Sequence, residues 1–210
     1  MGKRCIIAFT AGVMIVFSNT GCLMTSGYQN ARMLRSGEVQ IIPDIAGAYD
    51  AGAIEKDCYL STGAQVGLGI TKRFNVGIRA AYYSSLTDED RNGPFIGVIP
   101  KIGLMQDKMA LAFPAYFYYT DGYPGGQFDA RLIYSHFFTE KTDLTVTPLM
   151  SLTVSGYAAF GLGTNVSLGI PLGSLPVTIR PEIGIMTLAT DDWVPVMSYG
   201  VGFDIRPKKR

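Results

Sequence analysis

The sequence has 210 residues, a formal net charge of +1 and a mean hydropathy of +0.21, and it contains 25 glycines and 12 tyrosines. This length fits one domain or two small ones, and the near-neutral charge gives no reason to expect a nucleic-acid partner. The chain is apolar for a soluble protein, yet no run of about eighteen apolar residues follows the N-terminal region. High hydropathy without a spanning helix favours a protein that crosses a membrane with β-strands.

Residues 1–21 have the organisation of a secretory signal peptide. Lys3 and Arg4 precede an apolar stretch over residues 6–17, which is too short to span a bilayer. The sequence Thr20-Gly21-Cys22 that follows resembles the lipobox of bacterial lipoproteins, which implies cleavage before Cys22 and acylation of Cys22. An ordinary cleaved signal with an incidental cysteine is the alternative. Cleavage removes Cys5 and leaves two cysteines, so no disulfide framework is expected.

Residues 22–37 lack the regular pattern of the rest of the chain. The stretch 28–35, which Gly37 follows, predicts one or two helical turns. The segment is either a tether or a short plug for the domain over residues 38–210, and the sequence leaves both interpretations open.

From residue 38 onward, apolar side chains alternate with small or polar ones. In the second strand, for example, Leu60, Val66 and Ile70 share one phase, whereas Gln65 and Gly67 share the other. Successive side chains of a strand point to opposite faces, so each strand has an apolar face and a polar face. The predicted strands are 39–49, 60–70, 74–83, 94–104, 109–119, 128–138, 144–154, 160–170, 177–187 and 195–205. The fifth is the least regular, because its second face is less polar than in the others.

The connections between these strands alternate in length. Residues 71–73, 106–107, 139–141 and 171–175 form mostly short turns, whereas 51–59, 84–93, 120–126 and 188–194 are longer and rich in Asp, Gly and Pro. Residues 155–156 are the one short member of the second group. Transmembrane barrels have short periplasmic turns and longer outer loops. The pattern predicts an all-β fold, a transmembrane antiparallel up-and-down β-barrel of about ten strands with both ends on the periplasmic side.

Aromatic residues gather near the strand ends. Those that border the longer loops are Tyr49, Tyr59, Tyr82, Tyr83, Phe95, Tyr118, Tyr119, Tyr123, Phe128, Tyr157 and Trp193, and those at the opposite ends are Phe74, Phe137, Phe138 and Phe203. Amphipathic rings favour the boundary between membrane and water. We therefore expect two aromatic girdles, the richer one on the outside.

The last strand ends in the pattern Ser198-x-Gly200-x-x-Phe203-x-Ile205, which resembles the closing-strand signal of bacterial outer-membrane β-barrels. The mature chain as a whole resembles small bacterial outer-membrane β-barrel proteins, and its front end resembles their lipid-anchored members. The resemblance implies a place in the bacterial cell outer membrane, with a lipid anchor at Cys22 on the periplasmic side. It also implies two partners, outer-membrane lipid and, during insertion, the barrel-assembly machinery.

Few residues offer catalytic or metal-binding chemistry. His136, the single histidine, is in phase with Tyr134 and Phe138, so we expect it to face lipid near the inner interface rather than to act as a base. Barrel proteases and lipid A deacylases of similar size rely on histidine at the outer rim, where this chain has none. The acidic clusters 88–90 and 191–192 suit Ca²⁺ or a basic partner, or are simply solvated. We expect no enzymatic activity, no cofactor and no metal site.

Eight charged residues fall in the polar phase and are expected to point into the barrel. They are Asp44, Arg79, Lys101, Asp129, Arg131, Arg180, Glu182 and Asp204. An unpaired buried charge costs several kcal/mol, so this balanced set predicts a salt-bridged interior rather than an ion-selective ring. The strand order places Arg180 near Glu182, Asp204 and Asp44, among which we expect its partners. Many glycines share the same phase and leave room for water, for a narrow passage or for residues 23–37.

These observations predict a non-catalytic outer-membrane barrel with a structural or surface-interaction role, whose outer loops meet an extracellular ligand. A narrow pore for small solutes is the first alternative, which the glycine-rich interior favours. A periplasmic lipoprotein barrel that binds a lipid-like ligand is the second, and it requires the apolar phase to face inward.

Overall fold

The computed structural model describes residues 26–50, 58–87, 92–120, 123–155, 158–189 and 194–207, most of which lie in β-strands. The predicted signal peptide, Cys22 and both acidic clusters lie outside these ranges. The strands are β1 (Val39–Asp50), β2 (Cys58–Thr71), β3 (Phe74–Ser85), β4 (Gly93–Met105), β5 (Met109–Ala112), β6 (Ala115–Thr120), β7 (Tyr123–Phe137), β8 (Asp143–Val154), β9 (Ala158–Pro171), β10 (Val177–Ala189) and β11 (Val194–Ile205). The described residues contain no helix that is long and apolar enough to cross a membrane.

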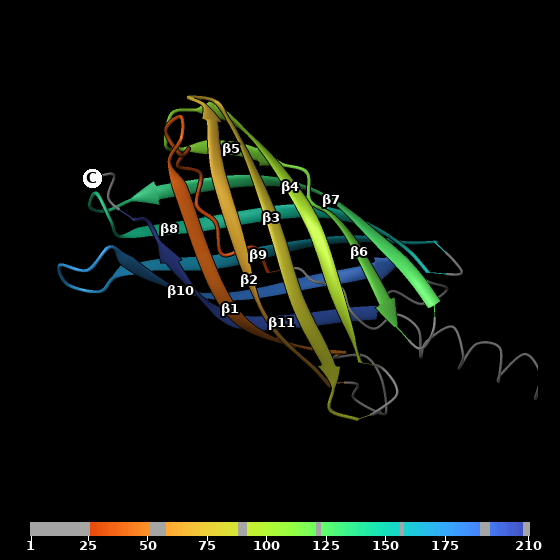
Figure 1. Cartoon of the computed structure of the whole chain (residues 1–210). Coiled ribbons are helices and arrows are strands. Elements are labelled where there is room, and N and C mark those ends of the chain that lie inside the picture. Colours follow the sequence, from red (N-terminus) through yellow and green to blue (C-terminus); the bar gives the residue numbers. More distant parts are fainter. Residues whose placement is uncertain are drawn as a thin grey trace, which may run out of the picture.

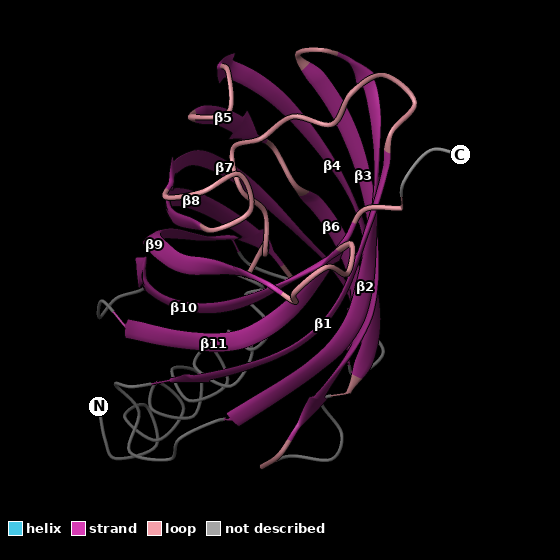
Figure 2. Ribbon diagram, turned by 90° about the vertical axis from the view of Figure 1, so that its left-hand side faces the viewer, coloured by secondary structure: helices cyan, strands magenta, loops and turns pink. Residues whose placement is uncertain are grey.

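The strands close into one antiparallel barrel. Strand β1 pairs with β2 on one side and with the last strand, β11, on the other, so the sheet has no free edge (Figure 2). Strands β5 and β6 each pair with both β4 and β7 and are the two halves of one wall strand. The wall thus has ten strands, which confirms the predicted fold class. The observed strand ends lie within two residues of the predicted ones, except that β7 begins at Tyr123 instead of residue 128.

Two prolines interrupt the hydrogen-bond ladders of the fifth wall strand. A proline has no N–H and removes a bond from the ladder wherever it stands. Pro114 separates β5 from β6, and Pro100 on β4 lies opposite Phe113. Each proline still accepts a hydrogen bond through its carbonyl. The Phe113 N–H donates to the Pro100 carbonyl at 2.9 Å, and the Asp129 N–H donates to the Pro114 carbonyl at 2.9 Å. The strand therefore loses bonds at this point without losing its register.

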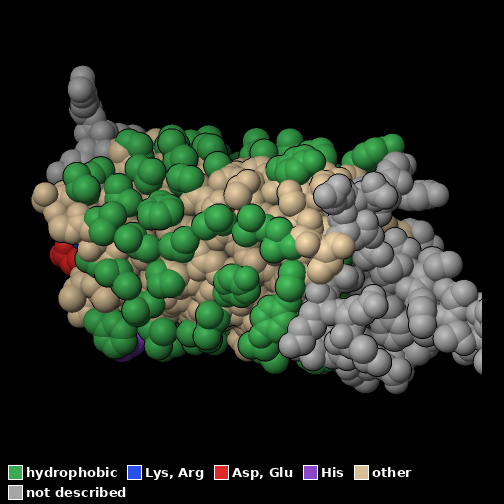
Figure 3. Space-filling view, turned by 90° about the horizontal axis from the view of Figure 1, so that it is seen from below, with side chains coloured by type: hydrophobic (Ala, Val, Ile, Leu, Met, Phe, Trp, Pro, Cys, Tyr) green, Lys and Arg blue, Asp and Glu red, His purple; other side chains and the backbone are tan. Residues whose placement is uncertain are grey.

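The apolar phase of the strands faces outward. Val66 is 49% exposed, whereas its neighbour Gln65 is 3% exposed, and the same contrast recurs along the other strands. On the face drawn in Figure 3, hydrophobic side chains cover the described part of the wall and an acidic group appears only at one end. An apolar exterior around a polar interior is the arrangement of a transmembrane barrel. The lipid-binding alternative, which required the apolar phase to face inward, is therefore wrong.

Three residues predicted for the outer aromatic girdle point into the barrel instead. Tyr83, Phe95 and Tyr118 are 1%, 4% and 9% exposed, whereas Tyr82 and Tyr119 are 50% and 55% exposed. Because neighbouring residues of a strand face opposite sides, two adjacent tyrosines cannot both lie in a girdle. The outer girdle therefore contains fewer aromatic residues than their positions along the strands predict.

Candidate functional site

The barrel interior holds a stretch of the chain itself. Residues 26–36, here called the lumen segment, precede β1 and run inside the wall (red to orange, Figure 1). The Ser26 carbonyl accepts a bond from Arg79, halfway along β3. At Gly37 the chain reaches the barrel end that carries the short turns, where the Gly37 N–H donates to the Gly69 carbonyl at 2.8 Å. The segment thus extends from the middle of the lumen to the short-turn end.

The lumen segment is not helical, so the predicted turns of helix over 28–35 are wrong. Its backbone groups bond to the wall instead of to each other. The Ala31 N–H donates to Ser135 Oγ at 2.8 Å, and Ser26 O accepts from Arg79 at 2.9 Å and from Arg131 at 3.3 Å. Helix formation satisfies each N–H through a carbonyl four residues away, and here side chains on the strands take that role.

Glu182 on β10 binds the N-terminal part of the segment. Its Oε1 accepts from the Gly27 N–H at 2.9 Å and its Oε2 from the Tyr28 N–H at 3.1 Å. Tyr28 has a φ of +49°, a left-handed conformation that non-glycine residues seldom adopt. Two successive N–H groups around such a residue form a concavity that binds anions. The conformation of the segment is therefore matched to this carboxylate.

Lys101 on β4 binds the segment further along the chain, toward the short-turn end. Its Nζ donates to the Asn30 carbonyl at 2.6 Å and to the Arg32 carbonyl at 3.1 Å. The side chain is 5% exposed, so these carbonyl oxygens replace the water that a free ammonium group would bind. An ammonium on carbonyls and a carboxylate on N–H groups together hold the segment by its backbone.

Tyr28 fixes the segment through its side chain as well. The ring packs with Ile42 and Ala46 in a buried cluster, and the hydroxyl donates to the Ile45 carbonyl at 3.2 Å. A Cβ on Gly202 would come within 2.6 Å of Tyr28 Cγ. The missing side chain on β11 therefore makes the space that the ring occupies. Ile42 is an apolar residue in the polar phase of β1, and it faces inward, where it packs against this ring.

Two pairs of the predicted interior charges meet each other. Arg79 donates to Asp44 Oδ1 at 2.6 Å, and Arg131 bonds to Asp129, with its Nε at 3.0 Å from Asp129 Oδ2. All four side chains are buried. Each arginine also donates to Ser26 O, so both pairs adjoin the N-terminal end of the lumen segment.

Arg180 forms the third cluster, at the short-turn end. It makes two bonds to Asp143, at 2.9 and 2.6 Å, and its Nε lies 3.5 Å from Asp204 Oδ2. Asp204 also accepts from Arg206. Of the three partners expected for Arg180, only Asp204 is one. Asp44 pairs with Arg79 and Glu182 binds the segment, so that part of the prediction is wrong.

Sequence reasoning missed Asp143 and Arg206 because both stand at strand ends. Asp143 is nevertheless fully buried and also accepts from Asn30 Nδ2 at 3.2 Å. Gly169 lies on β9, between the strands of Asp143 and Arg180, and a Cβ there would come within 2.5 Å of Asp143 Oδ2 and 2.9 Å of Arg180 Nη2. A glycine in the polar phase between two charged strands was the available signal.

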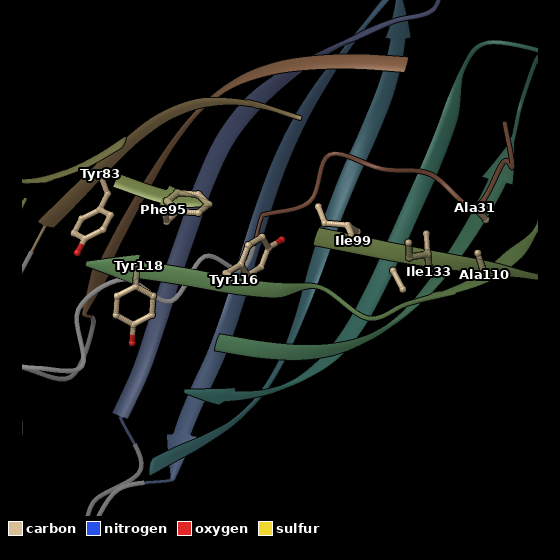
Figure 4. Close-up of a cluster of buried hydrophobic side chains, with 9 residues drawn as sticks. Ala31, Tyr83, Phe95, Ile99, Ala110, Tyr116, Tyr118 and Ile133 are labelled. Atoms are coloured by element: carbon tan, nitrogen blue, oxygen red, sulfur yellow. The ribbon is translucent and has the colours of Figure 1, made fainter. Parts of the chain in front are cut away.

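One side of the lumen is apolar. Tyr83, Phe95, Tyr116 and Tyr118 gather on β3, β4 and β6, and Ile99, Ala110, Ala112 and Ile133 continue the cluster to Ala31 of the lumen segment (Figure 4). This wall accounts for the weak alternation of the fifth strand, whose inward residues are Ala110, Ala112, Tyr116 and Tyr118. Beside the segment, a cavity of about 10 Å³ remains among Gly27, Gln65, Thr147, Asn165 and Glu182, which is room for roughly one water molecule.

The remaining candidates for chemistry stand apart from the lumen. His136 is exposed on the outer face, with its ring 5.0 Å from that of Phe138. Cys58 carries a free thiol at the start of β2. Among the residues that the structure describes, no group of three or more His, Cys, Asp or Glu side chains is placed to hold a metal ion.

No protein-family model and no curated protein matches the sequence. Among solved structures, the KdgM porin has a TM-score of 0.48 and 12% identity over 77% of this chain and 98% of its own. The Neisserial surface protein A (NspA) has a TM-score of 0.39 and 9% identity over 80% of this chain and 97% of its own. The N-terminal β-barrel domain of Pseudomonas aeruginosa OprF has a TM-score of 0.32 and 10% identity over 82% of this chain and 100% of its own. These neighbours are bacterial outer-membrane β-barrels.

Proposed function

We propose that the protein is a non-catalytic β-barrel of the bacterial outer membrane that is closed at rest and acts through its outer loops. The observation that carries the proposal is the lumen segment, which lies across the interior and bonds to side chains on β3, β4, β7 and β10. A passage for solutes needs continuous water, and the segment takes that space. The buried ion pairs beside it narrow the lumen further.

Conductance in planar lipid bilayers tests this closed state. We expect the purified full-length protein to insert and to give only rare, small current steps. Stable, long-lived open channels from the unmodified protein would show that the lumen conducts at rest and would overturn the proposal. Insertion is checked independently on a gel, because a folded barrel migrates differently before and after boiling.

A narrow pore for small solutes is the second candidate. It is favoured by the way in which the segment is held, since its described contacts with the rest of the barrel are hydrogen bonds, side-chain packing and a half-exposed ion pair between Arg32 and Asp107. Such contacts can be exchanged for water or for another molecule. A pore function therefore requires that the lumen segment leave, and the variants described below separate a closed barrel from a gated one.

We also propose that Cys22 is acylated, on the strength of the signal-like N-terminus and the Gly21-Cys22 pair. Four residues span at most roughly 14 Å, so an acylated Cys22 stays within that distance of Ser26. Because Ser26 lies inside the lumen, insertion of the lipid in the periplasmic leaflet and docking of the segment compete for the same few residues. Loss of radiolabelled fatty acid from Cys22→Ser tests acylation, and unchanged labelling would exclude it.

We also propose three partners for the protein. Outer-membrane lipid contacts the apolar exterior, the barrel-assembly machinery inserts the chain, and an extracellular ligand meets the outer loops. Protease treatment of intact cells tests the last point, because cleavage within the outer loops requires that they reach the cell surface.

A further inference from the structure

Most charges in the lumen are paired within the wall. Arg79 pairs with Asp44, Arg131 with Asp129, and Arg180 with Asp143 and Asp204. These pairs need nothing from the lumen segment, although Arg79 and Arg131 also donate to it. The ion pairs themselves would remain if the segment were absent, although Arg79, Arg131 and Asp143 would each lose one hydrogen bond to it.

Lys101 and Glu182 are different. Neither has an ion-pair partner among the described residues. Lys101 directs its ammonium at the carbonyls of Asn30 and Arg32. Glu182 accepts from the N–H groups of Gly27 and Tyr28 with its two carboxylate oxygens, and from the wall Asn165 Nδ2 donates to Glu182 Oε1 at 3.1 Å. A lone buried charge costs several kcal/mol. These two residues are thus stabilised by the backbone of the segment in the way that a binding site is stabilised by its ligand.

The two charges also match the polarity of a peptide. The acid meets N–H donors at one end of residues 27–32, and the base meets carbonyl acceptors at the other end. Every peptide carries these backbone groups, so this contact selects for chain direction rather than for sequence. Selectivity comes from two side-chain positions. An aromatic ring fits the space beside Gly202, and a small residue fits where Ala31 is fully buried.

We propose that the lumen is a binding site for an extended oligopeptide, that residues 27–32 are its resident ligand, and that the barrel keeps its fold when this ligand leaves. The fold should persist because the ladder is closed through β1 and β11 and three ion-pair clusters lie within the wall. This inference deepens the proposed function, since it names the class of molecule that can occupy the closed lumen.

A severed segment tests the proposal in the full chain. A site-specific protease sequence is inserted between Ser36 and Gly37, at the short-turn end, and the barrel is folded before it is cut. We expect the cut segment to remain bound and then to exchange with a fluorescent synthetic peptide of residues 26–36 in a saturable manner. The barrel should keep its heat-dependent gel mobility after the exchange. Loss of that mobility when the segment leaves, or no saturable binding, would overturn the proposal.

Backbone recognition is tested with a matched peptide that is N-methylated at Gly27 and Tyr28. This peptide keeps every side chain but loses the two N–H groups that Glu182 accepts. Hydrogen bonds to a charged group typically change affinity by roughly 10–100-fold, so we expect a loss in that range. In a Glu182→Gln barrel the two peptides should differ much less, whereas a lipid-facing Ile183→Ala barrel should behave like the parent. Equal affinities of the two peptides for the parent barrel would contradict backbone recognition.

Conductance separates this inference from the closed-barrel function. Washing out the cut segment should increase the current, and adding the peptide should decrease it again. If the peptide binds but the current stays low throughout, the binding site is supported and the segment is not what closes the barrel. If the uncut protein already conducts, the closed-barrel function fails while peptide binding stands on its own measurement.

Discussion

Tyr28 shows how a single residue holds the lumen segment in place. Its left-handed backbone costs roughly 1–2 kcal/mol for a residue with a Cβ. The bonds from Gly27 and Tyr28 to Glu182, the hydroxyl bond to Ile45 and the packing beside Gly202 offset this cost. The conformation is therefore stable only while the barrel surrounds it.

Replacing this ring should loosen the segment. We expect Tyr28→Ala to increase the frequency of current steps in planar bilayers and to lower the unfolding temperature, because the ring leaves a void against Ile42 and Ala46. Tyr134→Ala is the matched control, since it removes the same ring from a side chain that is 47% exposed on the outer face. Equal currents for the two variants would mean that Tyr28 does not restrain the segment.

Arg180 provides a second test at a single residue. Arg180→Ala leaves the buried Asp143 without its arginine, and breaking a buried pair typically costs about 3–5 kcal/mol. We expect a fall of that order in the free energy of unfolding, measured by urea titration in detergent.

A double variant distinguishes loss of pairing from loss of packing. Arg180→Ala with Asp143→Asn keeps the truncated side chain but removes both charges of the pair, while Asp204 keeps its bonds to Arg206. This variant should recover a large part of the stability that Arg180→Ala loses. Recovery would be absent if packing of the long side chain, rather than its charge, supports the fold.

At the scale of the strand, alternation predicted the elements well and their interior contacts poorly. Period two places Gln65 inside and Val66 outside without reference to any other strand. The partner of Arg180 depends on which strands face each other across the lumen and on space such as that at Gly169. Neither feature is local, so Asp143 was missed. Residues 28–35 were predicted as helix for the same reason, because Lys101, Ser135 and Glu182 bind that backbone from distant parts of the chain.

The outward phase of β2 leads to a prediction that depends on depth. Val66 lies within the strand and Val39 at the beginning of β1, and they are 49% and 38% exposed. An arginine on the lipid face costs about 2–4 kcal/mol at the bilayer midplane and about 0–1 kcal/mol near the interface. We therefore expect Val66→Arg to destabilise the protein in lipid vesicles far more than Val39→Arg. Similar costs at both positions would argue against a membrane around this part of the wall.

For the molecule as a whole, the segment and the wall depend on each other unequally. The wall has a closed ladder and its own ion pairs, whereas the segment is held by groups that the wall and its turns supply. This asymmetry is the physical reason to treat residues 26–36 as a ligand of the barrel. It also gives the two ends of the barrel different characters, because the segment joins β1 at the short-turn end.

The orientation of the barrel in the membrane follows from this difference between its ends. Short turns are periplasmic in transmembrane barrels and longer loops are outside. Glu140 is exposed in the turn after β7, whereas Leu86 is 66% exposed just beyond the opposite end of β3. In a Cys58→Ser background, we expect a membrane-impermeant maleimide to label Leu86→Cys on intact cells and to leave Glu140→Cys unlabelled until the outer membrane is permeabilised. The background protein provides the baseline for any reaction at Cys22. Labelling of Glu140→Cys alone on intact cells would reverse the orientation, and the lumen segment would then join the wall at the cell surface.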